Sequence, residues 1–113
     1  MKNIYLDELK KLLEQAHPGL ASSDELDFKN VFGAVAGYVD GNIFITCGKF
    51  GVALKLPSEK LEELFKEMDV ERLRYFPKGH IKKEYAVLPG RILTDERLFR
   101  ELLDKSIGHV CAP

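Results

Sequence analysis

Apolar and polar residues alternate along the chain at two different periods, which predict helices and strands in separate blocks. Residues 4–16 place leucines three and four positions apart, the pattern of an amphipathic helix. Asn3 precedes this segment as an N-cap, and Pro18 ends it because the residue before a proline avoids helical geometry. Residues 20–28 are mostly polar and predict a connector.

The next stretch, residues 32–56, predicts consecutive antiparallel strands joined by tight turns. Asp40-Gly41 separates two apolar runs. A type I′ turn needs positive φ at both central residues, and Asp-Gly adopts that geometry readily. A second turn signal lies at Gly48-Lys49. The strands expected around these turns are 30–39, 42–47 and 50–56.

Two glycines, Gly33 and Gly37, share one face of the strand expected at 30–39. A glycine inside a strand marks a bulge, a bend or a close approach of another group. We therefore expect a helix to pack closely on this face. Added bulk at Gly37 should then destabilise the protein more than truncation of the nearby Val39.

The remaining pattern predicts a helix at 58–68, strands at 72–76 and 82–88, and a helix at 94–107. The resulting order is α-β-β-β-α-β-β-α. Because strands come in blocks and do not alternate with helices, the expected fold class is α+β, with an antiparallel sheet and helices packed on one face. A length of 113 residues predicts a single domain over 1–113.

Composition narrows the function only slightly. The chain is 45% hydrophobic and 31% charged with a formal net charge of −1, which gives no overall attraction to DNA or membranes. It has no apolar run long enough to span a bilayer, and acids stand where a signal peptide would be apolar. We expect a cytoplasmic protein without membrane contact.

Residues typical of catalysis or metal binding do not form a recognisable motif. Cys47 is the candidate nucleophile, but none of the histidines (His17, His80 and His109) stands in a motif with it. Metal-ligand spacing and a phosphate-binding glycine loop are also missing. The sequence therefore predicts no enzyme, no catalytic residues, no metal and no cofactor.

Positive charge gathers in residues 72–91, where the only acid is Glu84. The candidate nucleic-acid or partner-binding residues are Arg72, Arg74, Lys78, Lys82, Lys83 and Arg91. Interleaved aromatics, Tyr75, Phe76 and Tyr85, could stack on bases. The alternative, which we prefer, is a solvated strand surface whose aromatics point into the core. Lys82 and Lys83 are neighbours and should point to opposite faces of a strand.

Several short motifs occur in a characteristic order. They are Phe32-Gly33, Gly37-Tyr38-Val39-Asp40-Gly41-Asn42-Ile43-Phe44, Val52-Ala53-Leu54-Lys55-Leu56, Phe76-Pro77, Lys82-Lys83-Glu84-Tyr85 and Leu88-Pro89. Over about residues 28–108 the chain resembles the TfoX/Sxy N-terminal domain family, although Ala34 stands where many members have a second glycine. The resemblance implies the same order of elements.

The resemblance also implies a link to natural competence, in which full-length members activate transcription. Those members carry a second, helical domain, for which we expect no room before Pro113. The predicted function is a non-enzymatic regulatory module with an unidentified protein partner. The alternative is a direct but weak nucleic-acid binder that uses residues 72–91.

Overall fold

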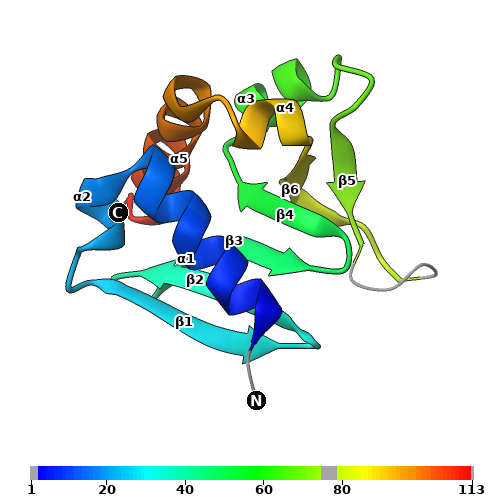
Figure 1. The fold of residues 1–113 in the computed structure, drawn as a ribbon. Helices are drawn as coiled ribbons and strands as arrows, with labels where there is room; N and C mark the ends of the chain where they lie inside the picture. Colours follow the sequence, from blue (N-terminus) through cyan, green and yellow to red (C-terminus); the bar gives the residue numbers. More distant parts are fainter. Residues whose placement is uncertain (1–2, 75–78, 113) are drawn as a thin grey trace.

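The computed structural model describes residues 3–74 and 79–112. Within these residues, antiparallel strands form one six-stranded sheet in the order β1-β2-β3-β4-β6-β5 (Figure 1). The strands are β1 (Leu26–Val31), β2 (Ala34–Val39), β3 (Asn42–Gly48), β4 (Gly51–Lys55), β5 (Glu71–Leu73) and β6 (Lys82–Leu88). The helices are α1 (Ile4–Ala16), α2 (Pro18–Ala21), α3 (Ser58–Leu64), α4 (Gly90–Leu93) and α5 (Glu96–Val110).

The predicted α+β class, antiparallel sheet and order of elements are confirmed. The predicted helix cap at Asn3 is present, since its side chain accepts a hydrogen bond from the Leu6 amide at 3.2 Å. Asp95 caps α5 in the same way, accepting from the Leu98 amide at 3.1 Å. The helix expected at 58–68 ends at Leu64, and residues 75–76 of the strand expected at 72–76 lie outside the described residues.

The structure adds β1, which the sequence analysis missed. The strand expected at 30–39 is a hairpin instead. The connector predicted at 20–28 is wrong for residues 20–21, which end α2, and for residues 26–28, which begin β1. The chain turns at Phe32 and Gly33, with φ of 49° and 78°. Positive φ is uncommon for a bulky aromatic residue, so Phe32 gave no turn signal.

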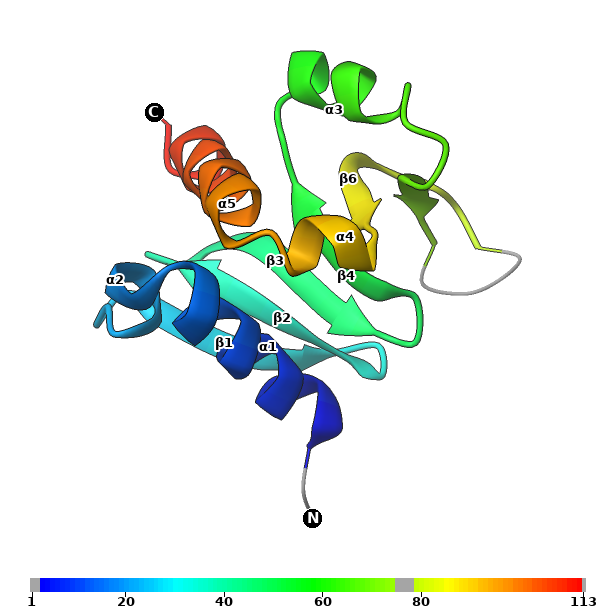
Figure 2. The same cartoon turned by 45° about the horizontal axis from the view of Figure 1, so that its top comes forward.

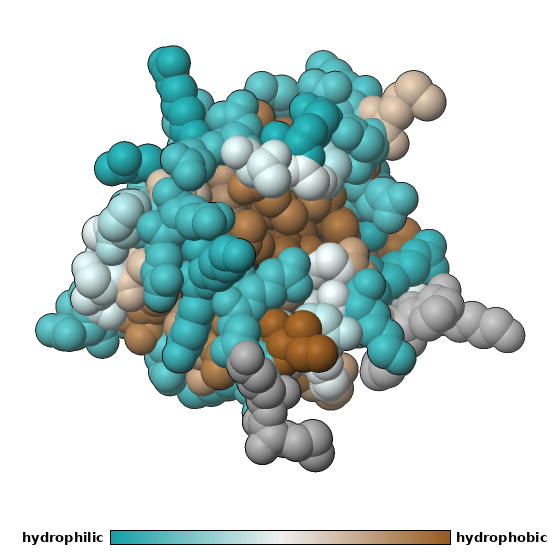
Figure 3. All heavy atoms as spheres, viewed as in Figure 1, coloured by the Kyte–Doolittle hydropathy of each residue, from teal (hydrophilic) through white to brown (hydrophobic). Residues whose placement is uncertain are grey.

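The helices pack on one face of the sheet, as predicted. Helix α1 packs against β2 and β3, α5 packs against β3 and β4, and α3 packs against β6. Figure 2 shows α1, α2, α4 and α5 on the near side of the strands. Figure 3 shows apolar side chains between α1 and α4, surrounded by hydrophilic ones.

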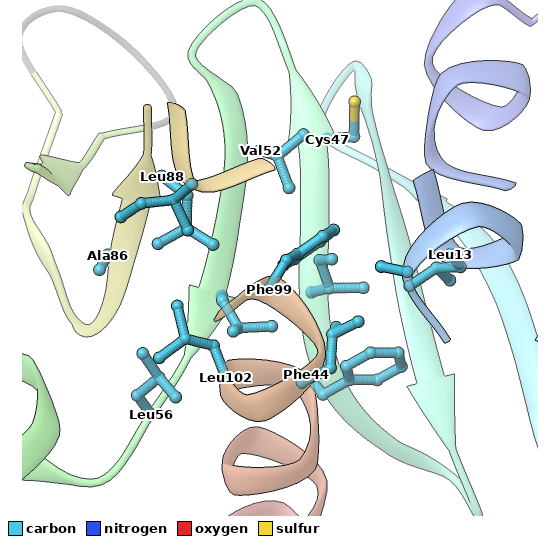
Figure 4. Close-up of a cluster of buried hydrophobic side chains, with 14 of the residues drawn as sticks. Leu13, Phe44, Cys47, Val52, Leu56, Ala86, Leu88, Phe99 and Leu102 are labelled. Carbon is cyan, nitrogen blue, oxygen red and sulfur yellow. The ribbon is translucent and has the colours of Figure 1, made fainter. Parts of the chain in front are cut away.

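Beneath these helices lies the main hydrophobic core, part of which Figure 4 shows in close-up. Leu13 of α1, Phe99 of α5 and Phe44 of β3 are each fully buried there. Their burial is the main stabilising contribution, at about 1.5–3 kcal/mol for each large apolar side chain.

The close approach predicted at Gly37 is present, but the neighbours are not a helix. A Cβ atom at Gly37 would lie 2.7 Å from Ile45 Cγ2, 3.4 Å from Phe44 and 3.6 Å from Phe28. The register between β2 and β3 shifts at Gly37/Tyr38, which brings both Phe44 and Ile45 to this place. The other glycine, Gly33, lies in the turn, where a Cβ atom would meet nothing within 4 Å.

The opposite face of the sheet carries a smaller cluster. Ala53, Leu73 and Tyr85 are buried there, with Phe50 and Val87 packed against them. Thr46 is in register with Ala53 and is 0% exposed, and its hydroxyl has no hydrogen-bond partner in the part of the chain that is described.

Candidate partner-binding site

The predicted basic residues lie in different surroundings, and Arg91 is already engaged. From α4 its Nε lies 2.6 Å from Asp69 Oδ2 and its Nη2 lies 2.7 Å from Asp69 Oδ1. A second carboxylate oxygen, Glu67 Oε2, lies 3.9 Å from Arg91 Nη2. The hydrogen bond from Arg91 lowers the pKa of Asp69, and that bond also raises the pKa of Arg91. A two-bond fork of this kind leaves little capacity for another anion.

Arg72 and Lys83 lie together in a hollow where α3 packs against β6. The hollow has a volume of about 390 Å³. Its lining residues are Ser58, Leu61, Glu62, Phe65, Lys66, Arg72 and Lys83. The guanidinium of Arg72 lies 4.3 Å from the centroid of the Phe65 ring, a cation–π contact that fixes the arginine at the wall.

Positive charge at this hollow is unbalanced. Lys66, Arg72 and Lys83 form no ion pair within residues 3–74 and 79–112, and Glu62 is the only carboxylate in the lining. Two nearby lysines are paired instead: Lys55 lies 3.3 Å from Glu84, and Lys60 lies 3.2 Å from Glu63. Three like charges around one hollow favour an anionic ligand.

The other predicted positions contribute less to this hollow. Arg74 donates from Nη1 to the Gly79 carbonyl at 3.2 Å. Lys82 is in register with the buried Leu73, so it and Lys83 point to opposite faces as predicted. Lys78 lies outside the described residues, as do Tyr75 and Phe76. Tyr85 is 8% exposed and packs with Ala53 and Leu73, as expected for an aromatic that points into the core.

The sequence analysis did not identify Lys66 as a candidate residue. Its place at the hollow depends on how α3 lies against β6, which no local pattern encodes. The available signal was its position next to Phe65, an apolar residue that follows α3 directly and packs against the core.

The surroundings of Cys47 keep its thiol protonated, and those of His17 provide two hydrogen-bond partners for its ring. The Cys47 sulfur is 0% exposed and lies 3.8 Å from Glu8 Oε2. Burial, reinforced by the charge of Glu8 and its hydrogen bond, raises the pKa of this thiol to about 12, which leaves it protonated at neutral pH. The His17 ring lies 2.7 Å from Asp104 through Nε2 and accepts from the Leu20 amide through Nδ1.

In the described part of the chain, no group of three or more His, Cys, Asp or Glu side chains is placed to hold a metal ion. Among the described helices, none has the length and apolar character needed to cross a membrane.

The family model of the TfoX N-terminal domain matches residues 19–110. The chain belongs to the TfoX N-terminal domain family. No curated protein and no solved structure matches it. The match confirms the resemblance noted in the sequence and extends it at both ends.

Within this TfoX N-terminal domain, the matched range covers every described strand and the whole hollow beneath α3. Helix α1 lies before the matched range, yet it supplies Leu9 and Leu13 to the core. The residues that line the hollow thus lie within the matched range, whereas α1, which covers the face of the sheet over β2 and β3, lies before it.

Proposed function

We propose that the chain is a non-enzymatic regulatory module of the cytoplasm that acts by binding a protein partner, with transcriptional control such as that of competence as its setting. Its membership of the TfoX N-terminal domain family supports a regulatory role. The observation that carries the choice of a protein partner is the hollow lined by Lys66, Arg72 and Lys83, which form no ion pair in the described part of the chain.

The chemistry of this hollow suits a short acidic segment of the partner. Arg72 can bind a carboxylate through two parallel hydrogen bonds, and the lysines can neutralise neighbouring carboxylates. Leu61 and the half-buried Phe65 offer an apolar surface between these charges. A segment that places a leucine between acidic residues would therefore satisfy both the charges and the apolar floor.

A nucleic-acid backbone fits the same surface less well. Glu59, Glu62 and Glu63 lie exposed along α3 and would repel a run of phosphates that passed over the hollow. Arg91 is held by Asp69, and Tyr85 is too buried to stack on a base. Glu62 also lines the hollow, but a short peptide can place its carboxylates against the three cations and avoid Glu59 and Glu63.

An NMR titration of the isotope-labelled full chain tests the proposal. The probe is a blocked hexapeptide of alternating glutamate and leucine, and the reference is the same peptide with glutamine in place of glutamate. We expect amide shifts at α3, β5 and β6 with a dissociation constant of about 0.1–1 mM, and none with the reference peptide. Arg72→Gln should weaken binding by about tenfold, the loss of roughly one charge-assisted hydrogen-bonded pair.

Lys105→Gln is the matched control, since Lys105 is exposed on α5 away from the hollow and its loss removes the same charge. It should leave the affinity unchanged. Absence of shifts at millimolar peptide, or equal weakening by both substitutions, would overturn the proposal. A short duplex that binds more tightly than the peptide and is lost with Arg72→Gln would move the function to nucleic-acid binding.

A further inference from the structure

Strand β1 forms one edge of the sheet, and its outward backbone groups can be identified. The Asp40 amide donates to the Glu25 carbonyl at 3.0 Å. In an antiparallel ladder, hydrogen-bonded pairs alternate with non-bonded pairs, so Asp27 and Lys29 also direct their backbone groups toward β2. The amide and carbonyl groups of Phe28 and Asn30 therefore point away from the sheet.

The side chains of β1 alternate in the same regular way. Phe28 is in register with Gly37 and lies on the helix-covered face, where it is half-buried. Asp27 and Lys29 are exposed on the opposite face. Lys29 lies over the Tyr38 ring at 5.0 Å, and Asp27 has no ion-pair partner in the described part of the chain.

We propose that two copies of the chain associate edge to edge through β1, with the two-fold axis at Phe28. In this register Asp27 lies directly opposite Lys29 of the second copy, and Lys29 lies opposite Asp27 of the second copy. The Phe28 backbone groups bond their counterparts, and the Asn30 amide donates to the Leu26 carbonyl of the second copy. Opposite charges facing each other across antiparallel strands are stabilising, by about 0.2–1 kcal/mol per pair.

The charge pattern selects this register over its neighbours. A two-fold axis at position 27 would place two Asp27 side chains opposite each other, and an axis at position 29 would do the same with two Lys29 side chains. Like charges directly opposite are destabilising. The axis at Phe28 pairs opposite charges twice and also brings the two Phe28 rings together, a favourable cross-strand pair.

The edge is also accessible to a second copy. Helix α1 packs over β2 and β3, and its N-terminal part also reaches β1 (Figures 1 and 2). Asn3 Nδ2 donates to Asn30 Oδ1 at 3.1 Å, and Lys10 Nζ lies 5.9 Å from the centroid of the Phe28 ring. Both contacts are made by side chains and leave the outward backbone groups of Phe28 and Asn30 unused. This association lies at the opposite end of the sheet from the hollow at α3 and does not depend on it.

Light scattering of the full chain from micromolar to millimolar concentration tests the association. The wild type should move with concentration from 12.8 kDa toward twice that mass. Lys29→Asp and Asp27→Lys should each remain at the monomer mass, because each places like charges opposite each other. The double charge swap should restore the wild-type behaviour, and circular dichroism checks that each variant is folded.

A second pair of variants separates the backbone from the charges. Asn30→Pro removes an outward amide without breaking a bond to β2, whereas Asn30→Ala keeps that amide. Only the proline variant should lose association. A wild type that stays at 12.8 kDa at every concentration, or a dimer that the double swap fails to restore, overturns the proposal.

Discussion

The two ends of the sheet carry charge in different ways. At the β1 end, Asp27 and Lys29 alternate in sign along an edge strand. At the opposite end, Lys66, Arg72 and Lys83 outnumber the one carboxylate, Glu62, and give one hollow a positive charge. An edge of alternating sign is complementary to a rotated copy of itself, whereas a surface of one sign repels its copy and needs a partner of different chemistry.

The comparison shows why the net charge of −1 says little about partners. Arg91, neutralised by Asp69, and Arg72, without an ion pair in the described chain, count equally in that sum. Only their positions in the structure show that Arg91 is neutralised and that Arg72 is not. A surface charge contributes to recognition when its own chain leaves it unbalanced.

Gly37→Val should have the largest effect on stability and should disturb the β1 end first. The added side chain would meet Ile45 and Phe28, and overpacking of this kind costs about 1–3 kcal/mol. Urea unfolding measures the change, with Val39→Ala as the control that should cost less. A midpoint equal to that of the wild type would show that the close approach at Gly37 has no energetic consequence.

Thr46→Val should act in the opposite direction and leave both ends of the sheet unchanged. The buried Thr46 hydroxyl has no partner in the described structure, so an isosteric apolar side chain should stabilise the fold by about 1 kcal/mol. Thermal unfolding provides the measurement. Thr46→Ser keeps the hydroxyl and loses the methyl group, so a Ser variant more stable than the Val variant would contradict this account.

Cys47 should make the fold sensitive to alkali by a smaller amount. The unfolded thiol starts to ionise near its ordinary pKa of 9.0, while the folded thiol keeps its proton until about 12. The folded state then binds more protons, so stability should fall as pH rises from 9 to 12. Urea unfolding across that range measures it, and Cys47→Ala should show a shallower fall.

Arg91→Gln should have the smallest effect on peptide binding, which sharpens the contrast with Arg72. Because Asp69 already engages Arg91, its loss should change the affinity for the acidic peptide by less than about twofold, below 0.4 kcal/mol. The pKa of Asp69 should rise, since the hydrogen bond that lowers it is gone. NMR titrations with peptide and with pH measure the peptide affinity and the pKa of Asp69. A tenfold loss of peptide affinity would place Arg91 in the binding surface.

Much of the sheet could be predicted because its turns carry local signals. Asp40-Gly41 adopts positive φ at both positions, as the type I′ turn requires. The Phe32-Gly33 turn has the same geometry, but a bulky aromatic residue in its first position concealed it. Residues 26–28 of β1 were therefore predicted as a connector, and its last two residues as the start of the strand at 30–39.

The candidate site could be predicted only in part, because its contacts join segments distant in sequence. Arg72 and Lys83 were identified from the density of positive charge. The contact of Arg91 with Asp69 spans 22 residues, and the position of Lys66 depends on the packing of α3. The spacing of apolar and polar residues along the chain encodes neither the Arg91–Asp69 contact nor the position of Lys66.

Fluorescence anisotropy on one preparation of the full chain tests the central claim, that the hollow at α3 serves a protein partner. The labelled acidic peptide and a labelled short duplex are titrated at several salt concentrations. We expect Arg72-dependent peptide binding, and duplex binding no tighter than about 10⁻⁶ M at physiological salt. A nanomolar, sequence-selective duplex complex that survives raised salt would contradict the account.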